Sequence, residues 1–186
     1  SSLPERKGEP KVIPDRSSLI AVTEKLKRAN ISYSLGGSGL MLSLGLTDAV
    51  GDWDVMVEAP KEQVMNALQH DRVEEKISGD YPFGTKYKLV VHSGGPEVEI
   101  ICGLSIHTDK GLCNLTASPS FTWNDIQVGS PEVWYVAYSL MNRSEKAGKL
   151  LAYLKEVGAN QPFIQLLLKE PLPDEIMEEI RSLIET

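Results

Sequence analysis

The feature that most constrains this chain is a glycine-rich segment, residues 36–39, between two apolar segments of different character. Residues 31–35 alternate apolar and polar side chains, which predicts a short strand that leads into the glycines. Residues 40–44 are mostly apolar, and we expect them to begin a helix. Because Gly36, Gly37 and Gly39 lack a Cβ atom, the backbone there can turn tightly and approach an anion closely. The unpaired N–H groups at the start of such a helix would point at that anion.

Glycine runs of this kind also occur in plain turns and linkers. No Lys-Ser or Lys-Thr follows the glycines at the spacing of a Walker phosphate-binding loop. The segment also lacks the spacing of the dinucleotide-binding fingerprint, although its strand–loop–helix context is similar. The glycines alone therefore leave a phosphate cradle and an ordinary turn as alternatives.

Two carboxylates follow about fifteen residues later, where Asp52 and Asp54 open the apolar strand predicted for residues 52–58. The period of two in a strand places both carboxylates on one side and Trp53 on the other, in the core. Two like charges side by side repel each other unless a cation compensates them. Carboxylate oxygens suit Mg²⁺, which often shares its ligands with substrate phosphates. A phosphate site beside a divalent metal is what phosphoryl or nucleotidyl transfer requires.

A third acid, Glu99, interrupts the apolar strand predicted for residues 97–102. A Ser-Gly-Gly-Pro turn joins this strand to a second β-rich run, residues 87–92, which indicates a hairpin. Two alternatives remain open at this point. Either Glu99 joins Asp52 and Asp54 in a three-carboxylate site for two metals, or Glu97 and Glu99 both line a solvent-facing edge.

The remaining pattern predicts helices over residues 17–29 and 61–70, and a further strand within residues 121–128. From Ser130 onward the chain reads as helical, with a helix that ends near Gly158 and closing helices over 161–169 and 173–184. Strands and helices first, then helices alone, predict an α+β or α/β core with a helical C-terminal segment. We expect a flexible N-terminal tail over residues 1–16, the core over 17–129 and the C-terminal helical segment over 130–186.

Composition restricts the partners. The formal net charge is −7, which disfavours broad binding to long nucleic acid. Cys102 and Cys113 are too few for a disulfide scaffold and lack zinc-site spacing, so a cytoplasmic setting is expected, with Cys102 buried. No apolar run approaches a membrane span. His70, His92 and His107 show no metal-ligand spacing.

The order of these motifs, the glycine turn, then Asp-x-Asp, then a lone Glu after a hairpin, resembles the nucleotidyltransferase fold superfamily, which includes DNA polymerase beta. The later helix, with Trp134, Tyr138 and then Arg143 and Lys146, is similar to the aromatic-rich helix and Arg-x-x-Lys of small uncharacterised prokaryotic members. The resemblance covers approximately residues 31–154. It implies a nucleotidyltransferase-like mixed β-sheet flanked by helices.

The resemblance also implies site residues. Gly36, Gly37 and Ser38 would bind the nucleoside triphosphate, with Arg143 and Lys146 on its phosphate oxygens. Asp52 and Asp54 would bridge two Mg²⁺ ions, and Glu99 would ligate the catalytic metal and help to deprotonate the attacking hydroxyl. These three acids would be both the catalytic and the metal-binding residues. The alternative for Arg143 and Lys146 is a solvated helix end favoured by the helix dipole.

Two departures from the family pattern bear on activity. Glu99 stands where relatives more often have Asp, and Asp48, Val50 and Gly51 stand where many carry an Arg and a Thr. The resemblance implies transfer of an NMP group from an NTP to a hydroxyl of a small molecule or protein. The departures favour the alternative, a catalytically degenerate module that binds a nucleotide or a partner. The helices from Gln161 onward either cover the acceptor cleft or form a homodimer contact.

Overall fold

The strand order of the central sheet determines which polar residues meet. The structure is a computed structural model that describes residues 14–185. It contains a seven-stranded mixed sheet in the order β3-β4-β5-β2-β1-β9-β8 and a separate two-stranded sheet, β6-β7. The central strands are β1 (Tyr33–Gly36), β2 (Trp53–Val57), β3 (Arg72–Lys76), β4 (Tyr87–His92), β5 (Val98–Cys102), β8 (Phe121–Trp123) and β9 (Ile126–Val128), and the small sheet pairs β6 (Ser105–Thr108) with β7 (Gly111–Asn114).

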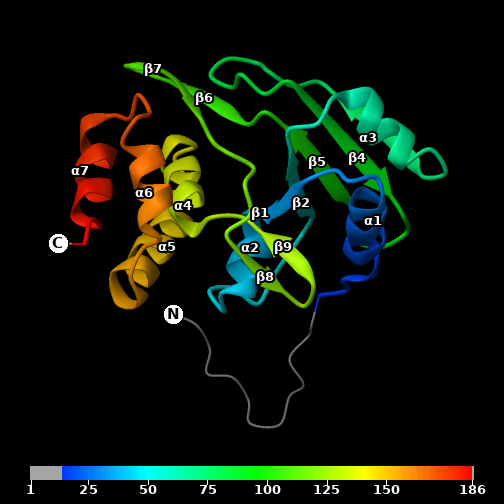
Figure 1. Ribbon diagram of the computed structural model, residues 1–186, viewed down its shortest axis with the longest axis horizontal. Helices are drawn as coiled ribbons and strands as arrows, with labels where there is room; N and C mark the ends of the chain where they lie inside the picture. The colour runs from blue at the N-terminus through cyan, green and yellow to red at the C-terminus, as the bar shows by residue number, and fades with distance from the viewer. Residues whose placement is uncertain (1–13, 186) are drawn as a thin grey trace, which may run out of the picture.

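Helices cover both faces of the central sheet (Figure 1). Helices α1 (Ser17–Arg28) and α3 (Lys61–Ala67) pack beside β4 and β5, and the short α2 (Gly37–Ser43) follows β1 directly. The C-terminal segment forms α4 (Pro131–Leu140), α5 (Ser144–Val157), α6 (Gln161–Leu167) and α7 (Asp174–Ser182), which gather on the other side. The predicted α+β class, with a mixed sheet flanked by helices and a helical C-terminal segment, is confirmed.

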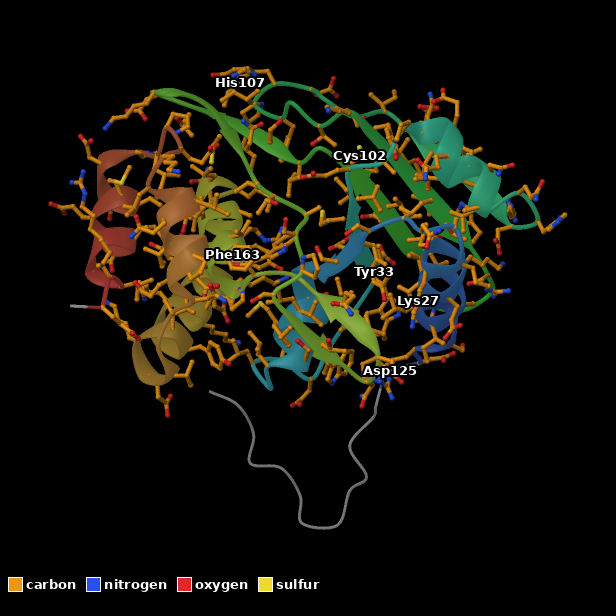
Figure 2. The ribbon with its side chains drawn as sticks, in the orientation of Figure 1. Lys27, Tyr33, Cys102, His107, Asp125 and Phe163 are labelled. Carbon is orange, nitrogen blue, oxygen red and sulfur yellow. The ribbon has the colours of Figure 1, made fainter. Side chains whose placement is uncertain are left out.

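Alternation along the central strands separates core from site. Trp53, Val55 and Val57 are fully buried on the face that α1 and α3 cover, as the sequence predicted for Trp53. Asp54 and Met56 consequently project from the opposite face. The side chain of Cys102 is also buried, as expected. Figure 2 shows Cys102 and Tyr33 inside the molecule, whereas Lys27 and Asp125 lie at its periphery.

The N-terminus of α4 has the cap that its sequence predicts. Ser130 Oγ accepts a hydrogen bond from Val133 N at 3.0 Å, and Pro131 occupies the first helical position. The next residue, Glu132, is only 2% exposed, because its carboxylate accepts hydrogen bonds from Ser130 Oγ and from Asn160 N. Glu132 therefore joins the start of α4 to the residue before α6.

Four local predictions need correction. The strand β3 was not predicted, because this edge strand carries four charged residues and a single apolar one, Val73. The β6-β7 hairpin was not predicted either. Residues 121–128 form two strands rather than one, with positive φ angles at Asn124 and Asp125 in the tight turn between them. Helix α3 ends at Ala67, before the predicted residue 70.

Most of the predicted N-terminal tail lies outside the described residues. No helix in the described range is long and apolar enough to cross a lipid bilayer.

Candidate functional site

Asp54 and Glu99 lie side by side because β2 and β5 run parallel in a register that pairs these two residues. On its other side Asp54 pairs with Gly36, the last residue of β1. The chain then turns through Gly37 into α2. Two of the three predicted acids and the glycine turn therefore meet at the centre of the sheet.

The proximity of the two carboxylates changes the chemistry of Asp54. Burial, together with the adjacent carboxylate of Glu99, raises the pKa of Asp54 to about 7. Lys88, on the neighbouring strand β4, opposes this effect and lies with its Nζ 3.4 Å from Glu99 Oε1. Near neutral pH the negative charge of the two acids is therefore partly compensated by Lys88.

Both acids line a cavity of about 650 Å³ between the sheet, α4 and the loop after β3. Ser38, Arg143 and Lys146 line the same cavity, which therefore brings together five of the predicted site residues. The other lining residues are Ile77, Ser78, Gly79, Asp80, Tyr81, Phe83, Thr85, Lys88, Ile101, Leu104, Trp134, Tyr138 and Met141.

Asp52 and Glu97 do not line this cavity. Asp52 is exposed and precedes β2, although Glu99 and Glu97 act with burial to raise its pKa. Glu97 precedes β5 and turns toward His92, with 3.0 Å between its Oε1 and His92 Nδ1. The structure thus brings together Asp54 and Glu99, and it leaves Asp52 at the rim.

The glycines of the turn are required by close packing. Gly37 has a φ of +57°, a conformation that favours glycine, and a Cβ there would overlap the Asp54 carboxylate. A Cβ on Gly36 would overlap the indole of Trp134 from α4. The turn therefore lies directly against the acid pair on one side and against the C-terminal helices on the other.

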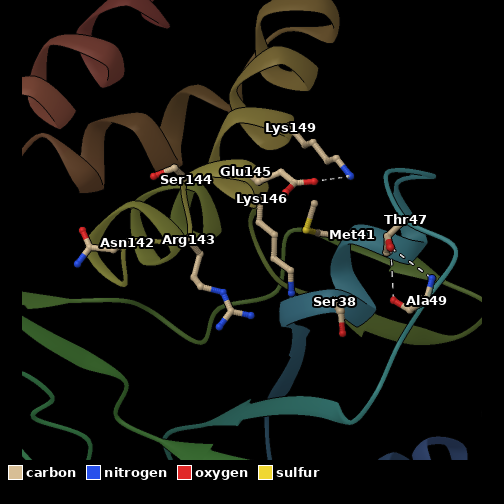
Figure 3. Close-up of a pocket in the computed structure, with 10 residues that line it drawn as sticks. All are labelled: Ser38, Met41, Thr47, Ala49, Asn142, Arg143, Ser144, Glu145, Lys146 and Lys149. Carbon is tan, nitrogen blue, oxygen red and sulfur yellow. Dashed lines mark hydrogen bonds and ion pairs between the residues drawn. The ribbon is translucent and has the colours of Figure 1, made fainter. Parts of the chain in front are cut away.

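A second cavity, of about 570 Å³, adjoins the first at Ser38, Arg143 and Lys146. In Figure 3, Lys146 extends from α5 toward Ser38, and the Arg143 guanidinium lies nearby. The remaining lining residues are Met41, Thr47, Ala49, Asn142, Ser144, Glu145 and Lys149. Lys149 is weakly paired with Glu145 at 3.9 Å, whereas neither Arg143 nor Lys146 forms an ion pair within the described residues.

The position of these cations favours an anion ligand over the alternative of a dipole-stabilised helix end. Arg143 is the N-cap of α5, and Lys146 lies in its first turn. The helix dipole is positive at this end, so it disfavours cations there. An anion between Arg143, Lys146 and Ser38 would interact favourably with both side chains and with the helix end.

Several residues that line the site were not predicted from the sequence. Lys88 was detectable in principle, because the predicted hairpin pairs Val90 with Glu99 and alternation then places Lys88 on the same face. Trp134 and Tyr138 belong to the predicted aromatic-rich helix but were not predicted as site residues; they are buried, and they also line the cavity. The loop residues Ile77 and Tyr81 carried no signal, since nothing in a polar loop identifies the cavity it faces.

The acid pair has the donor chemistry of a divalent-cation site. Two carboxylates held together by register, one of them with a raised pKa, are the oxygen ligands that Mg²⁺ prefers. Within residues 14–185 no group of three or more Asp, Glu, His or Cys side chains is arranged to hold a metal. Asp54 and Glu99 would therefore be the primary ligands, with water and substrate oxygens completing the shell.

The fold is similar to that of solved nucleotidyltransferase structures, as the sequence motifs predicted. A candidate nucleotidyltransferase from Thermotoga maritima, TM1012, superposes with a TM-score of 0.52 at 20% identity, over 74% of this chain and 91% of that one. The lincosamide antibiotic adenylyltransferase LnuA, with lincomycin bound, gives 0.52 at 13% identity over 74% and 97%.

A third solved structure, ANT(2")-Ia in complex with adenylyl-2"-tobramycin, gives a TM-score of 0.51 at 12% identity, over 88% of this chain and 95% of that one. No protein-family model and no curated protein sequence matches the chain. At these identities the likeness is one of fold.

Proposed function

We propose that this protein transfers a nucleoside monophosphate group from an NTP to a hydroxyl group. The acceptor oxygen bonds to the α-phosphorus, the bond from that phosphorus to the bridging oxygen breaks, and pyrophosphate leaves. The hydroxyl proton moves to the carboxylate of Glu99. Two of the solved structures with this fold are described as antibiotic adenylyltransferases or carry an adenylylated antibiotic, which supports the reaction class.

The observation that carries the proposal is the arrangement of charge across two adjoining cavities. Asp54 and Glu99 lie on the sheet, and Arg143 and Lys146 face the same space from α5. A triphosphate beside Ser38 would place its terminal phosphates against the two cations and its α-phosphate near the acids. Positioning of this kind, with charge stabilisation, is the main requirement of phosphoryl-type transfer.

Asp54 and Glu99 would hold Mg²⁺, with Asp52 available from the rim. When bound, the metal supplies Lewis-acid stabilisation of the attacking and leaving oxygens. The chain's own contribution is to align the nucleotide on the glycine turn and to hold Glu99 in place through Lys88, in a cavity that Trp134 and Tyr138 also line.

The test is a thermal-stability titration with each of the four NTPs, with and without Mg²⁺, followed by an assay for pyrophosphate release. We expect stabilisation by at least one NTP that requires Mg²⁺. In Asp54→Asn we expect pyrophosphate release to fall at least a hundredfold. Asp109→Asn, an exposed acid in the turn of the small hairpin, is the matched control and should behave as wild type. Indifference to all four NTPs would overturn the proposal.

One observation favours a second candidate, a module that binds nucleotide without turnover. Asp52 lies outside the cavity, and Lys88 already neutralises part of the charge on Glu99. Such a module would be stabilised by an NTP through Arg143 and Lys146, with the same affinity whether or not Mg²⁺ is present. It would release no pyrophosphate with any acceptor.

A further inference from the structure

The cavity that holds the acid pair also has apolar walls. Ile101 and Leu104 line it from the sheet side, and Trp134, Tyr138 and Met141 line it from the C-terminal segment. The outer wall is the loop between β3 and β4, through Ile77, Tyr81 and Phe83. Trp134 packs on the glycine turn, and Lys146 Nζ lies 5.4 Å from the centroid of the Tyr138 ring. A nucleotide held by Ser38, Arg143 and Lys146 would therefore lie beside these two aromatics and leave the outer wall free.

The outer wall is held in place by the β6-β7 hairpin. Gly84 N donates to Ser105 O at 2.9 Å, and His107 N donates to Pro82 O at 2.7 Å. The ring of Tyr81 stacks on that of His107, with 5.4 Å between the ring centroids. The loop therefore presents its side chains from a fixed frame, as a preformed ligand site does.

Two large apolar side chains at the mouth of the cavity are exposed. Ile77 is 89% exposed and Tyr81 is 82% exposed, more than any other large hydrophobic residue in the described range. Apolar groups left uncovered beside a cavity indicate a surface that a ligand covers. A volume of about 650 Å³ fits a drug-sized molecule.

Charge restricts the ligand further. The lining residues of the cavity include three acids, Asp54, Asp80 and Glu99, and three bases, Lys88, Arg143 and Lys146. Once nucleotide and metal engage Arg143, Lys146, Asp54 and Glu99, the remaining charged lining residues are Lys88, which is paired with Glu99, and the lone Asp80. A polycation would need several free carboxylates for charge complementarity, and the cavity then offers one, Asp80.

Building on the proposed function, we propose that the acceptor is a small alcohol, neutral or singly charged, whose hydroxyl is carried on an apolar ring-containing body. Ile77, Tyr81 and Phe83 cover that body, and Trp134 and Tyr138 line its inner face. The hydroxyl then lies near Glu99, which receives its proton as the oxygen bonds to the α-phosphorus and pyrophosphate departs. The loop after β3 is the specificity-determining element.

The test separates binding of the acceptor from binding of the nucleotide. Ligand-observed NMR titrations of the full chain would use 2-naphthaleneethanol as the neutral ring-bearing alcohol and tobramycin as the polycation. We expect saturable binding of the alcohol and none of tobramycin. In Ile77→Ser/Tyr81→Ser the Kd of the alcohol should rise at least tenfold, and Tyr81→Phe should retain wild-type binding.

Val157→Ser removes another exposed aliphatic side chain, at the far end of α5, so it controls for a general loss of apolar surface. The thermal shift given by ATP and Mg²⁺ should be unchanged in all these variants, because the loop does not contact the nucleotide side. Tobramycin binding without alcohol binding, or alcohol binding within twofold of wild type in the double variant, would overturn the inference. Transfer of the AMP group from ATP to a protein rather than to the alcohol would also overturn the inference.

The two proposals fail differently. If ATP binds but the alcohol does not, the acceptor class is wrong and the proposed reaction stands. If the alcohol binds but no NTP does, the proposed reaction is wrong and this cavity is not an acceptor site.

Discussion

A side chain at Gly37 would overlap the carboxylate of Asp54, and the backbone there has a positive φ that favours glycine. We expect Gly37→Ala to lower the free energy of unfolding by about 2–4 kcal/mol, from strain at a positive φ and from displacement of Asp54. NTP binding should be lost with it. Chemical denaturation and a thermal-shift titration measure the two effects.

Gly45 provides the matched control for this substitution. Its φ is +73°, close to that of Gly37, but a Cβ there meets nothing within 4 Å. Gly45→Ala should therefore cost only about 1 kcal/mol, from backbone strain alone, and leave NTP binding intact. Equal losses of stability in the two variants would show that contact with Asp54 is unimportant.

Asp54 makes the stability of the metal-free protein depend on pH. Its folded-state pKa of about 7 exceeds the usual aspartate pKa of 3.8, so between these values the folded state binds a proton that the unfolded state lacks. The stability that the folded state gains from binding this proton is fully present below about pH 4 and is lost as pH rises toward 7. At about 1.4 kcal/mol per pKa unit, Asp54→Asn should be about 2–4 kcal/mol more stable than wild type at pH 8 in EDTA.

Denaturation curves from pH 4 to 8 measure this difference, which should shrink steadily as pH falls. A stability difference for Asp54→Asn that stays constant across the range would contradict the raised pKa.

At the scale of single elements, the first turn of α5 carries a cation that the helix dipole disfavours. Lys146 Nζ also lies 5.4 Å from the centroid of the Tyr138 ring, and this cation–π contact offsets the unfavourable dipole interaction. Lys146→Gln should therefore change the stability of the ligand-free protein by less than about 1 kcal/mol, but it should weaken NTP binding about tenfold, since one phosphate contact is lost. Lys155→Gln, in the last turn, should lower stability by a few tenths of a kcal/mol and leave NTP binding unchanged. Thermal unfolding with and without NTP separates the two contributions.

The elements that carry the site were predictable, and those that frame it were not. The strand containing Asp54, the hairpin strand containing Glu99 and the glycine turn follow from alternation and from glycine placement, both of which are local signals. β3 was missed because this edge strand is mostly charged and exposed on both faces, so it lacks apolar alternation. The meeting of Trp134 with Gly36 depends on the parallel pairing of β1 with β9, a long-range contact that no local pattern reports.

Across the whole molecule, the β6-β7 hairpin links the proposed acceptor loop to the C-terminal helices. On one side it bonds to Pro82 and Gly84, and on the other Thr108 Oγ1 donates to Pro171 O at 2.6 Å. Lys110 also pairs with Asp174 at the start of α7. The hairpin is therefore a mechanical connection between two regions distant in sequence.

Weakening this connection should loosen the loop without unfolding the core. In Thr108→Val with Lys110→Gln we expect faster amide hydrogen exchange across residues 81–85, and unchanged exchange in β2 and β5. Ser182→Ala, which removes a local hydrogen bond at the end of α7, is the control. Unchanged exchange at residues 81–85 would show that the hairpin does not hold the loop.

The placement of Trp134 has an optical consequence. Of the three tryptophans, Trp53 is fully buried on the opposite face of the sheet and Trp123 lies in β8 under Arg16, whereas Trp134 lines the large cavity. Its emission should respond to occupancy of the cavity, and Trp134→Phe should abolish the response while Trp123→Phe leaves it unchanged. The indole that packs on the glycine turn is thus a built-in fluorescent reporter, with which a library of unlabelled compounds can be screened directly.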